Sequence, residues 1–294
     1  MDELLSSPLG ILLLARSIIE VSGTPPGMLW REHWECSSTE DLASCLQTLA
    51  LRVPGEGYFD HLSAERLSEL LVQSEEGFPP WNDRSLWQAG ILLASGLALR
   101  PFAAPFLAAP GAATWFTDLD RKHQEWASVG GIPPHSSFFH PDLRAYGAGN
   151  TRPRQTFWTS TNLTAHTSSW THFLRWGEDR QDPPYSRWRV EVSPSARVYE
   201  IHGPQAWHRL CLTYPAPSWM AYPVCQPDAL IEPDWQAVSQ DWDGIHVSVG
   251  GVLTTERVRW GTPGRQTHLF GWSVESMAWL RWVFGCVESL PDGN

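Results

Sequence analysis

Phe157-Trp158-Thr159-Ser160-Thr161-Asn162-Leu163 begins with two aromatic residues and continues into a run of small polar side chains. Aromatic residues and Thr favour β-strands, and successive side chains of a strand point to opposite faces. The stretch therefore predicts a strand with Ser160 on one face and Thr159 and Thr161 on the other. Such a strand can present hydroxyl groups at the floor of a cleft. An ordinary Thr-rich strand without a catalytic role is the alternative interpretation.

This stretch resembles the Phe-x-Ser-Thr-Ser-Leu strand of the mono-ADP-ribosyltransferases, in the class defined by an Arg, a Ser and a Glu. The resemblance implies that Ser160, as the first Ser of the triplet, orients a catalytic Glu against the substrate NAD. It also implies NAD-binding roles for Thr159, Thr161 and Asn162. Asn162 replaces the third hydroxyl of the family, and an amide can still donate and accept hydrogen bonds.

The composition is that of a folded protein. The 294 residues are 42% hydrophobic and 18% charged, which excludes a disordered chain, and they can bury a substantial core. A net charge of −11 disfavours non-specific binding to nucleic acid or to an anionic membrane, although a local basic groove remains compatible with it. The five cysteines form no Cys-x-x-Cys pair and the histidines show no ligand spacing, so we expect no metal site.

The apolar segment 8–21 is too short for a transmembrane helix and is interrupted by Arg16 and Glu20. It follows Asp2 and Glu3, whereas a signal peptide begins with a basic region. We therefore expect a core helix, a cytoplasmic protein and no membrane partner.

Two domains are predicted, a helical domain over 1–105 and a strand-rich domain over 106–294. Helix starts at 38–41 and 63–66 and an apolar run over 85–99 characterise the first part. Three prolines within 101–113 predict a semi-rigid, non-helical connector. The first domain is a candidate surface for a protein partner.

After the connector, the pattern changes to strands and turns. Alternating residues predict strands over 187–192, 196–201 and 244–252, and 168–176 is typical of a short helix. The fold class is therefore α+β. A hydroxyl strand followed at once by a helix is also the order found in the transferase family, which implies an ADP-ribosyltransferase-like domain.

Breaking the bond between ribose and nicotinamide passes through an oxocarbenium-like centre, so the site requires a cation for the pyrophosphate and a carboxylate near the ribose. The family places the Arg on the first strand of the catalytic domain. Arg121 follows the strand-like segment 113–116 and is the first choice, and Arg144 is the second. A surface pair of Arg121 with Asp118 or Asp120 is the alternative.

The carboxylate departs from the family pattern, because neither Glu-x-Glu nor Gln-x-Glu occurs after Ser160. Glu275 follows the strand-like segment 267–272 and is the first choice, with Ser273 at the first position of the pair. Asp243, which opens a strand after a turn, is the second choice, although Asp-Gly is equally an ordinary turn signal.

Tryptophan is abundant, with 18 residues in the chain. Aromatic rings stack on planar ligands, and Trp158, Trp170, Trp176 and Trp272 lie near the candidate residues in the sequence, where they could clamp nicotinamide or adenine. Core filling is the alternative for each ring.

The leading hypothesis is an ADP-ribosyltransferase or NAD glycohydrolase with an unknown acceptor, of the kind that acts as a toxin or effector. One rival is a Trp-rich protein that binds a small molecule or carbohydrate without chemistry. A second rival is a glycoside hydrolase that uses Asp241 or Asp243 together with Glu275.

Overall fold

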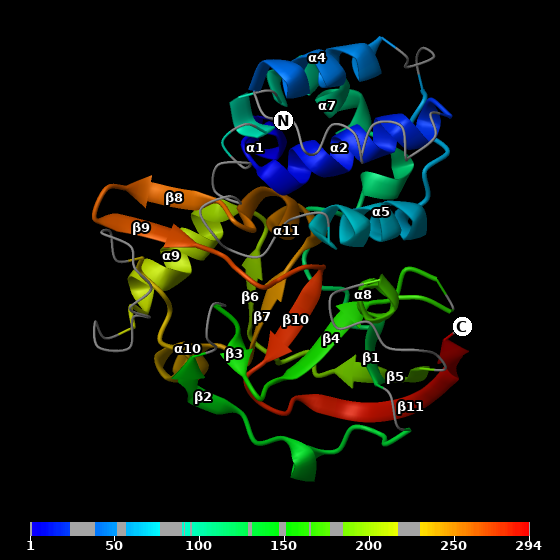
Figure 1. The fold of residues 1–294 in the computed structure, drawn as a ribbon. Helices are drawn as coiled ribbons and strands as arrows, with labels where there is room; N and C mark the ends of the chain where they lie inside the picture. The colour runs from blue at the N-terminus through cyan, green and yellow to red at the C-terminus, as the bar shows by residue number, and fades with distance from the viewer. Residues whose placement is uncertain are drawn as a thin grey trace. The chain divides into compact units, whose positions relative to one another are not determined.

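The computed structural model describes residues 2–23, 39–51, 57–76, 90, 92–94, 96–128, 131–146, 151–164, 166–176, 185–216 and 230–293. The chain divides into two compact units, Met1–Thr114 and Trp115–Asn294. The boundary expected at residue 105 falls within a helix of the first unit (Figure 1).

The described part of the first unit is helical. Its elements are α1 (Asp2–Leu5), α2 (Pro8–Val21), α4 (Thr39–Ala50), α5 (Ala64–Glu76), η1 (Gly96–Leu99), α7 (Arg100–Leu107) and η2 (Pro110–Ala112). The predicted core helix over 8–21 is confirmed as α2, which begins after Ser7, whose hydroxyl accepts the N–H of Gly10. The predicted start at 63–66 is confirmed, because Ser63 caps α5 in the same way by accepting the N–H of Arg66.

The prediction of a non-helical connector over 101–113 is wrong. Pro101 lies in the first turn of α7, where a helix leaves its N–H groups unbonded in any case. Pro105 lies inside α7, where it removes one backbone hydrogen bond from a short helix. The third proline, Pro110, begins η2. Pro101 and Pro110 thus lie where a helix begins, and α7 continues through Pro105.

The second unit contains the strands β1 (Gln124–Ser128), β2 (Asp142–Tyr146), β3 (Pro153–Arg154), β4 (Phe157–Thr161), β5 (Tyr185–Val192), β6 (Val198–Ile201), β7 (Gly244–Val247), β8 (Arg259–Thr262), β9 (Arg265–His268), β10 (Ser276–Trp279) and β11 (Phe284–Gly293). Its helical elements are η3 (Ser136–Phe138), α8 (Ser169–Trp176), α9 (Pro204–Thr213), α10 (Trp235–Asp241) and α11 (Val249–Thr255). Seven strands form one sheet in the order β11-β5-β1-β4-β10-β7-β6. The β6–β7 pair is parallel and the other pairs are antiparallel (Figure 1).

The α+β class is thereby confirmed, as are the strands predicted from the stretches 157–163 and 187–192 and the helix that follows the first of them. The strand predicted over 244–252 ends early, at Val247. Ser248 ends it, because its hydroxyl accepts the N–H of Gly251 and caps α11. The segment 113–116, expected to be strand-like, forms turns.

Alternation of side chains gives the sheet two chemically different faces. One face carries an apolar cluster at one end, with Leu119, Val192, Ala196, Met277 and Trp279 buried in it. The opposite face is covered in part by α8, which packs against β1 and β4. None of the described helices combines the length and the apolar character that a membrane span requires.

Candidate functional site

The polar centre of the second unit lies where β4 and β10 run side by side. Met277 is paired with Thr159 in this antiparallel ladder, so Glu275, the residue before β10, lies opposite Thr161 on the same face. The Thr161 backbone N–H donates to Glu275 Oε2 at 2.9 Å, and the Thr161 hydroxyl donates to Oε1 at 2.9 Å. Glu275 is 5% exposed, so this carboxylate is fixed almost out of solvent.

A chain of hydrogen bonds leads to Glu275 from β1. The Trp279 indole N–H donates to the Thr159 hydroxyl at 2.9 Å, and that hydroxyl donates to Gln124 Oε1 at 2.6 Å. Gln124 Nε2 then donates to the Thr161 hydroxyl at 3.0 Å. The donors are therefore directed toward Glu275 and hold its carboxylate in place.

His246 lies on the other side of Glu275. Its Nε2 is 3.2 Å from Glu275 Oε1, and its Nδ1 is 2.5 Å from Glu200 Oε2. Burial alone would lower the pKa of His246, but the hydrogen bonds to Glu200 and Glu275 outweigh it and raise the pKa to about 9. An imidazolium therefore lies between two carboxylates at neutral pH.

The cluster reaches solvent through Glu200, which also accepts the N–H of Leu119. His202, at the end of this path, is hydrogen-bonded to Asp118 at 2.9 Å and to Ser248 at 3.0 Å. The ligand atoms of Asp118, Glu200 and His202 lie within 4.8 Å of one another, a geometry that could hold a cation.

Ser160 lies on the opposite face of the sheet from Glu275. It is paired with Glu125 of β1, and its hydroxyl accepts the N–H of Trp170 at 3.0 Å. No hydrogen bond joins Ser160 to Glu275, both of which the structure describes. The expected contact between them is thus absent, because the period of two along β4 gives that position to Thr161.

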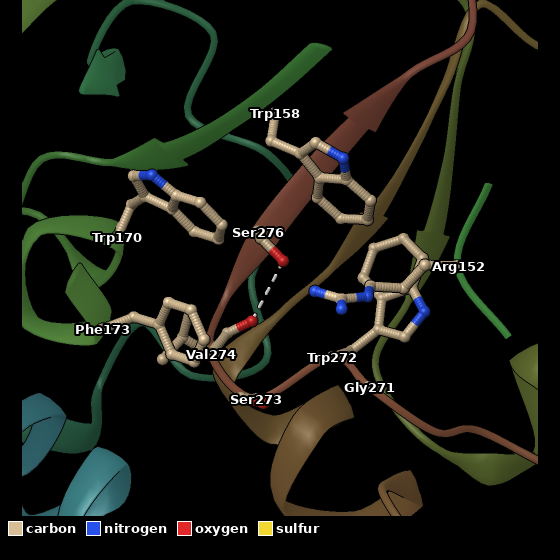
Figure 2. A pocket seen from close by; sticks show the side chains of 9 residues that line it. All are labelled: Arg152, Trp158, Trp170, Phe173, Gly271, Trp272, Ser273, Val274 and Ser276. Atoms are coloured by element: carbon tan, nitrogen blue, oxygen red, sulfur yellow. Dashed lines mark hydrogen bonds between the residues drawn. The ribbon is translucent and has the colours of Figure 1, made fainter. Parts of the chain in front are cut away.

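An aromatic pocket lies on the Ser160 face (Figure 2). Trp158, Trp170, Phe173 and Trp272 line a small, closely packed hollow, together with the guanidinium of Arg152. The Trp158 and Trp272 rings meet edge to face at 4.9 Å. The Arg152 guanidinium carbon lies 5.9 Å from the centre of the Trp158 ring. Trp158, predicted to bind NAD, thus lies in a hollow that β4 and β10 separate from Glu275.

Arg121 does not form the alternative ion pair with Asp118 or Asp120. Its guanidinium donates to the carbonyls of Ser193 at 3.0 Å and Ala196 at 2.9 Å, and so holds the connection between β5 and β6. Asp118 pairs with His202 and Asp120 pairs with His123. Arg121 lies in the turn before β1, three residues ahead of Gln124, and so is not part of the strand.

Asn162 and Arg144 were also predicted to bind NAD. The Asn162 N–H donates to the carbonyl of His123 at 2.8 Å. Its side-chain Oδ1 is buried and finds no donor among the described residues. Arg144 lies on β2, and its side chain falls outside the described part of the chain, as does that of Trp176.

Asp243, the residue before β7, makes structural contacts at the end of that strand away from Glu275. Its Oδ2 accepts the N–H of Arg197 at 2.8 Å, and the carboxylate pairs with the guanidinium groups of Arg197 and Arg281 at 3.7 and 3.5 Å. The Asp243 carbonyl accepts the N–H of Leu280, five residues beyond Glu275. Five residues of strand span about 16 Å, which exceeds the 5–9.5 Å that separates paired glycosidase carboxylates. Asp241 is bonded to Tyr214 near the same end, so neither Asp forms a glycosidase pair with Glu275.

Sequence reasoning missed three members of the cluster, Gln124, Glu200 and His246. His246 interrupts an otherwise apolar alternating stretch, which was a usable signal for a polar role. Its partners Glu200 and Glu275 are 46 and 29 residues away in the sequence. The residue pattern within β7 does not indicate which distant residues pair with His246.

The chain was compared with family models, with curated proteins and with solved structures, and none of the three comparisons found a match.

Proposed function

We propose that this protein cleaves NAD at Glu275 and transfers ADP-ribose to an acceptor or to water. One observation carries the proposal: Glu275, late in the chain, is held by the hydroxyl strand β4, which in turn pairs with β1, the first strand of the unit. The resemblance of the segment 157–163 implies the same three components in the same chain order.

The arrangement supplies a carboxylate that hydrogen bonds hold in place. In the proposed reaction the bond between the ribose C1′ and the nicotinamide nitrogen breaks, and nicotinamide leaves with the bonding electrons. Glu275 accepts a hydrogen bond from a ribose hydroxyl and stabilises the positive charge that develops on the ring. The acceptor, or water, then bonds to C1′ and releases a proton to solvent. Thr161 orients Glu275 in this proposal, the role that the resemblance implies for Ser160.

His246 distinguishes this site from a simple carboxylate. Its imidazolium and the Thr161 groups bind the same carboxylate, so part of the charge of Glu275 is already compensated in the free protein. Gln124 occupies the face of β1 on which Glu275 lies, and Arg121, the first choice for the Arg that the resemblance implies, lies before that strand. The proposal therefore leaves recognition of the pyrophosphate to other residues.

Release of nicotinamide from NAD by the purified full chain tests the proposal. We expect Glu275→Gln to reduce the rate at least about 100-fold, since one charged stabilising group is removed. Glu191→Gln, which changes an exposed carboxyl on β5, is the matched control and should leave the rate unchanged. Equal rates for the two variants, or no nicotinamide release from the unaltered chain with cell lysate as acceptor, would reject NAD cleavage.

The aromatic pocket favours a second candidate function, the binding of a planar ring without chemistry. Three Trp rings and one Phe ring around a single hollow offer stacking surface, and Arg152 adds a positive charge. This alternative expects Glu275→Gln to leave ligand affinity intact and no product to form. Substitution of Trp158 by Leu should then abolish binding.

A further inference from the structure

Gln124, the first residue of β1, is fully buried, and its side-chain amide is hydrogen-bonded at both the oxygen and the nitrogen. Its Oε1 accepts the hydroxyl proton of Thr159 at 2.6 Å. Its Nε2 donates to the Thr161 hydroxyl at 3.0 Å and to the backbone carbonyl of Asp120 at 3.1 Å. An amide offers one acceptor oxygen and two N–H donors, and each of the three has a matching partner here.

The partners fix the orientation of this amide. The Asp120 carbonyl can only accept, so the nitrogen and not the oxygen of the amide must lie beside it. The Trp279 indole can only donate, and it donates to the Thr159 hydroxyl at 2.9 Å. The Thr159 proton is therefore directed to Gln124, which must present an oxygen to it. A rotated amide would place two acceptor oxygens 3.1 Å apart and would aim the Thr159 proton at an N–H group.

The orientation of the amide decides where the Thr161 hydroxyl directs its single proton. An amide nitrogen donates and does not accept, so the Thr161 oxygen accepts from Gln124. The Thr161 proton is then left for Glu275 Oε1, which lies 2.9 Å away. An acceptor in place of Gln124 Nε2 would compete with Glu275 for that proton.

We propose that Gln124 is a positioning residue of the reaction at Glu275, because its amide nitrogen forces the Thr161 hydroxyl to donate to the carboxylate. This role rests on the proposed function, since it assigns Gln124 a part in the same reaction. Gln124 and Trp279 are 0% exposed and Thr159 is 1% exposed, so water does not readily replace a missing member of the chain. Loss of the amide would leave the Thr161 hydroxyl free to rotate away from Glu275.

A double-mutant cycle over Gln124 and Thr161 tests the inference in the full chain. Gln124→Leu removes the amide with little change in volume, and Thr161→Val removes the hydroxyl. Gln124→Leu alone should lower kcat for nicotinamide release about three- to tenfold and leave KM within about twofold, since the carboxylate acts in the transition state. In the Thr161→Val background, the same substitution should lower kcat less than about twofold, because the hydroxyl through which Gln124 acts is already absent. Additive losses in kcat would overturn the inference.

Gln124→Glu tests the direction of the hydrogen bond. A carboxylate at this position accepts the Thr161 proton and diverts it from Glu275, so at pH 8 the loss in kcat should exceed that of Gln124→Leu about threefold or more. Protonation of the introduced carboxyl restores a donor. The rate relative to the unaltered chain should therefore rise as the pH falls toward 5, whereas the relative rate of Gln124→Leu should stay constant.

Gln205→Glu, an exposed substitution of the same kind on α9, is the matched control and should follow the unaltered chain at every pH. Equal losses for Gln124→Glu and Gln124→Leu at every pH would overturn the inference. Thermal unfolding of each variant verifies that the fold is retained, and the double-mutant cycle alone decides if Gln124→Glu does not fold.

The free energies of unfolding of the four proteins in the cycle separate this inference from NAD cleavage. They should also be non-additive, since Gln124 and Thr161 share a hydrogen bond in the folded protein. Non-additive unfolding energies with additive losses in kcat would reject the positioning role and leave the proposed function in place. Absence of nicotinamide release from the unaltered chain would reject the proposed function, and the unfolding energies would then still decide whether Gln124 donates to Thr161.

Discussion

Thr161 donates both its backbone N–H and its hydroxyl to the carboxylate of Glu275, across the boundary between β4 and β10. The two residues are 114 positions apart in the sequence, and strand pairing alone brings them together. Ser160, the residue before Thr161 in β4, points to the opposite face of the sheet. We therefore expect substitutions of Ser160 and of Thr161 to differ sharply in their effect on any reaction at Glu275.

Thr161→Val should reduce nicotinamide release about 10- to 100-fold, because it removes a hydrogen bond to a charged group of about 1.5–3 kcal/mol while preserving shape. Ser160→Ala should change the rate less than about threefold, since its hydroxyl binds the N–H of Trp170. Steady-state rates of the two variants and of Thr161→Ser, which retains the hydroxyl, form the measurement. A greater loss with Ser160→Ala than with Thr161→Val would return the orienting role to Ser160.

His246 should make the free energy of unfolding depend on pH in the alkaline range. Its folded-state pKa of about 9 exceeds the unfolded value of 6.5, so its stabilising contribution is complete below pH 6.5 and is lost as pH rises through 9. The loss is on the order of 3 kcal/mol for a shift of this size. Urea unfolding between pH 6 and pH 10 measures it. His246→Gln should flatten this part of the curve, and an unchanged slope in that variant would assign the pH dependence to other groups.

Asp243 should matter for stability and not for turnover. It accepts the N–H of Arg197 and pairs with Arg197 and Arg281, so Asp243→Ala leaves a partly buried N–H without its acceptor and two guanidinium groups without this carboxylate. The expected cost is about 1–3 kcal/mol in urea unfolding. Nicotinamide release, measured well below the unfolding midpoint, should remain within about twofold. A large loss of turnover with unchanged stability would restore Asp243 as the candidate carboxylate.

The buried pair of Glu125 and Arg187 should show a cost that depends on which partner is removed. Both side chains are fully buried. The Glu125 carboxylate accepts hydrogen bonds from Arg187 Nε at 2.9 Å, from Arg187 Nη2 at 2.5 Å and from the Ser168 hydroxyl at 3.0 Å. Glu125→Leu alone strands a buried guanidinium and should cost about 3–5 kcal/mol. The double variant Glu125→Leu/Arg187→Met should recover most of that loss. A double-mutant cycle of unfolding free energies provides the measurement, and simple additivity of the two losses would contradict it.

The sequence predicted those elements whose signals are local. The hydroxyl strand, the strand over 187–192 and the helix over 8–21 each carry their period within a few residues. The prediction over 101–113 failed because Pro is disfavoured in the interior of a helix, whereas Pro101 lies in the first turn of α7, where it is accepted, and Pro105 is tolerated further along the same helix. The early end of β7 depends on Ser248, which caps α11. That role could not be predicted from the sequence without first predicting that α11 begins there.

The candidate site was predictable only in part, for a related reason. Glu275 could be selected from its place late in the chain, but the choice between Ser160 and Thr161 depends on the register of β4 against β10. A shift of one residue exchanges the two faces, and a single sequence does not contain that register. His246 and Gln124 join the site through pairings of β7 with β10 and of β1 with β4, which are equally non-local.

The strand β11 ends the sheet on one side, and an open sheet edge can recruit strands from other molecules. Two irregularities interrupt its pairing with β5, and Glu288, Pro291 and Asp292 lie along it. Irregular pairing, negative charge and a missing N–H each oppose the addition of a further strand. Replacement of these three residues by Thr or Val would therefore leave β11 as an unprotected edge strand, to which strands of other protein molecules could add and start aggregation.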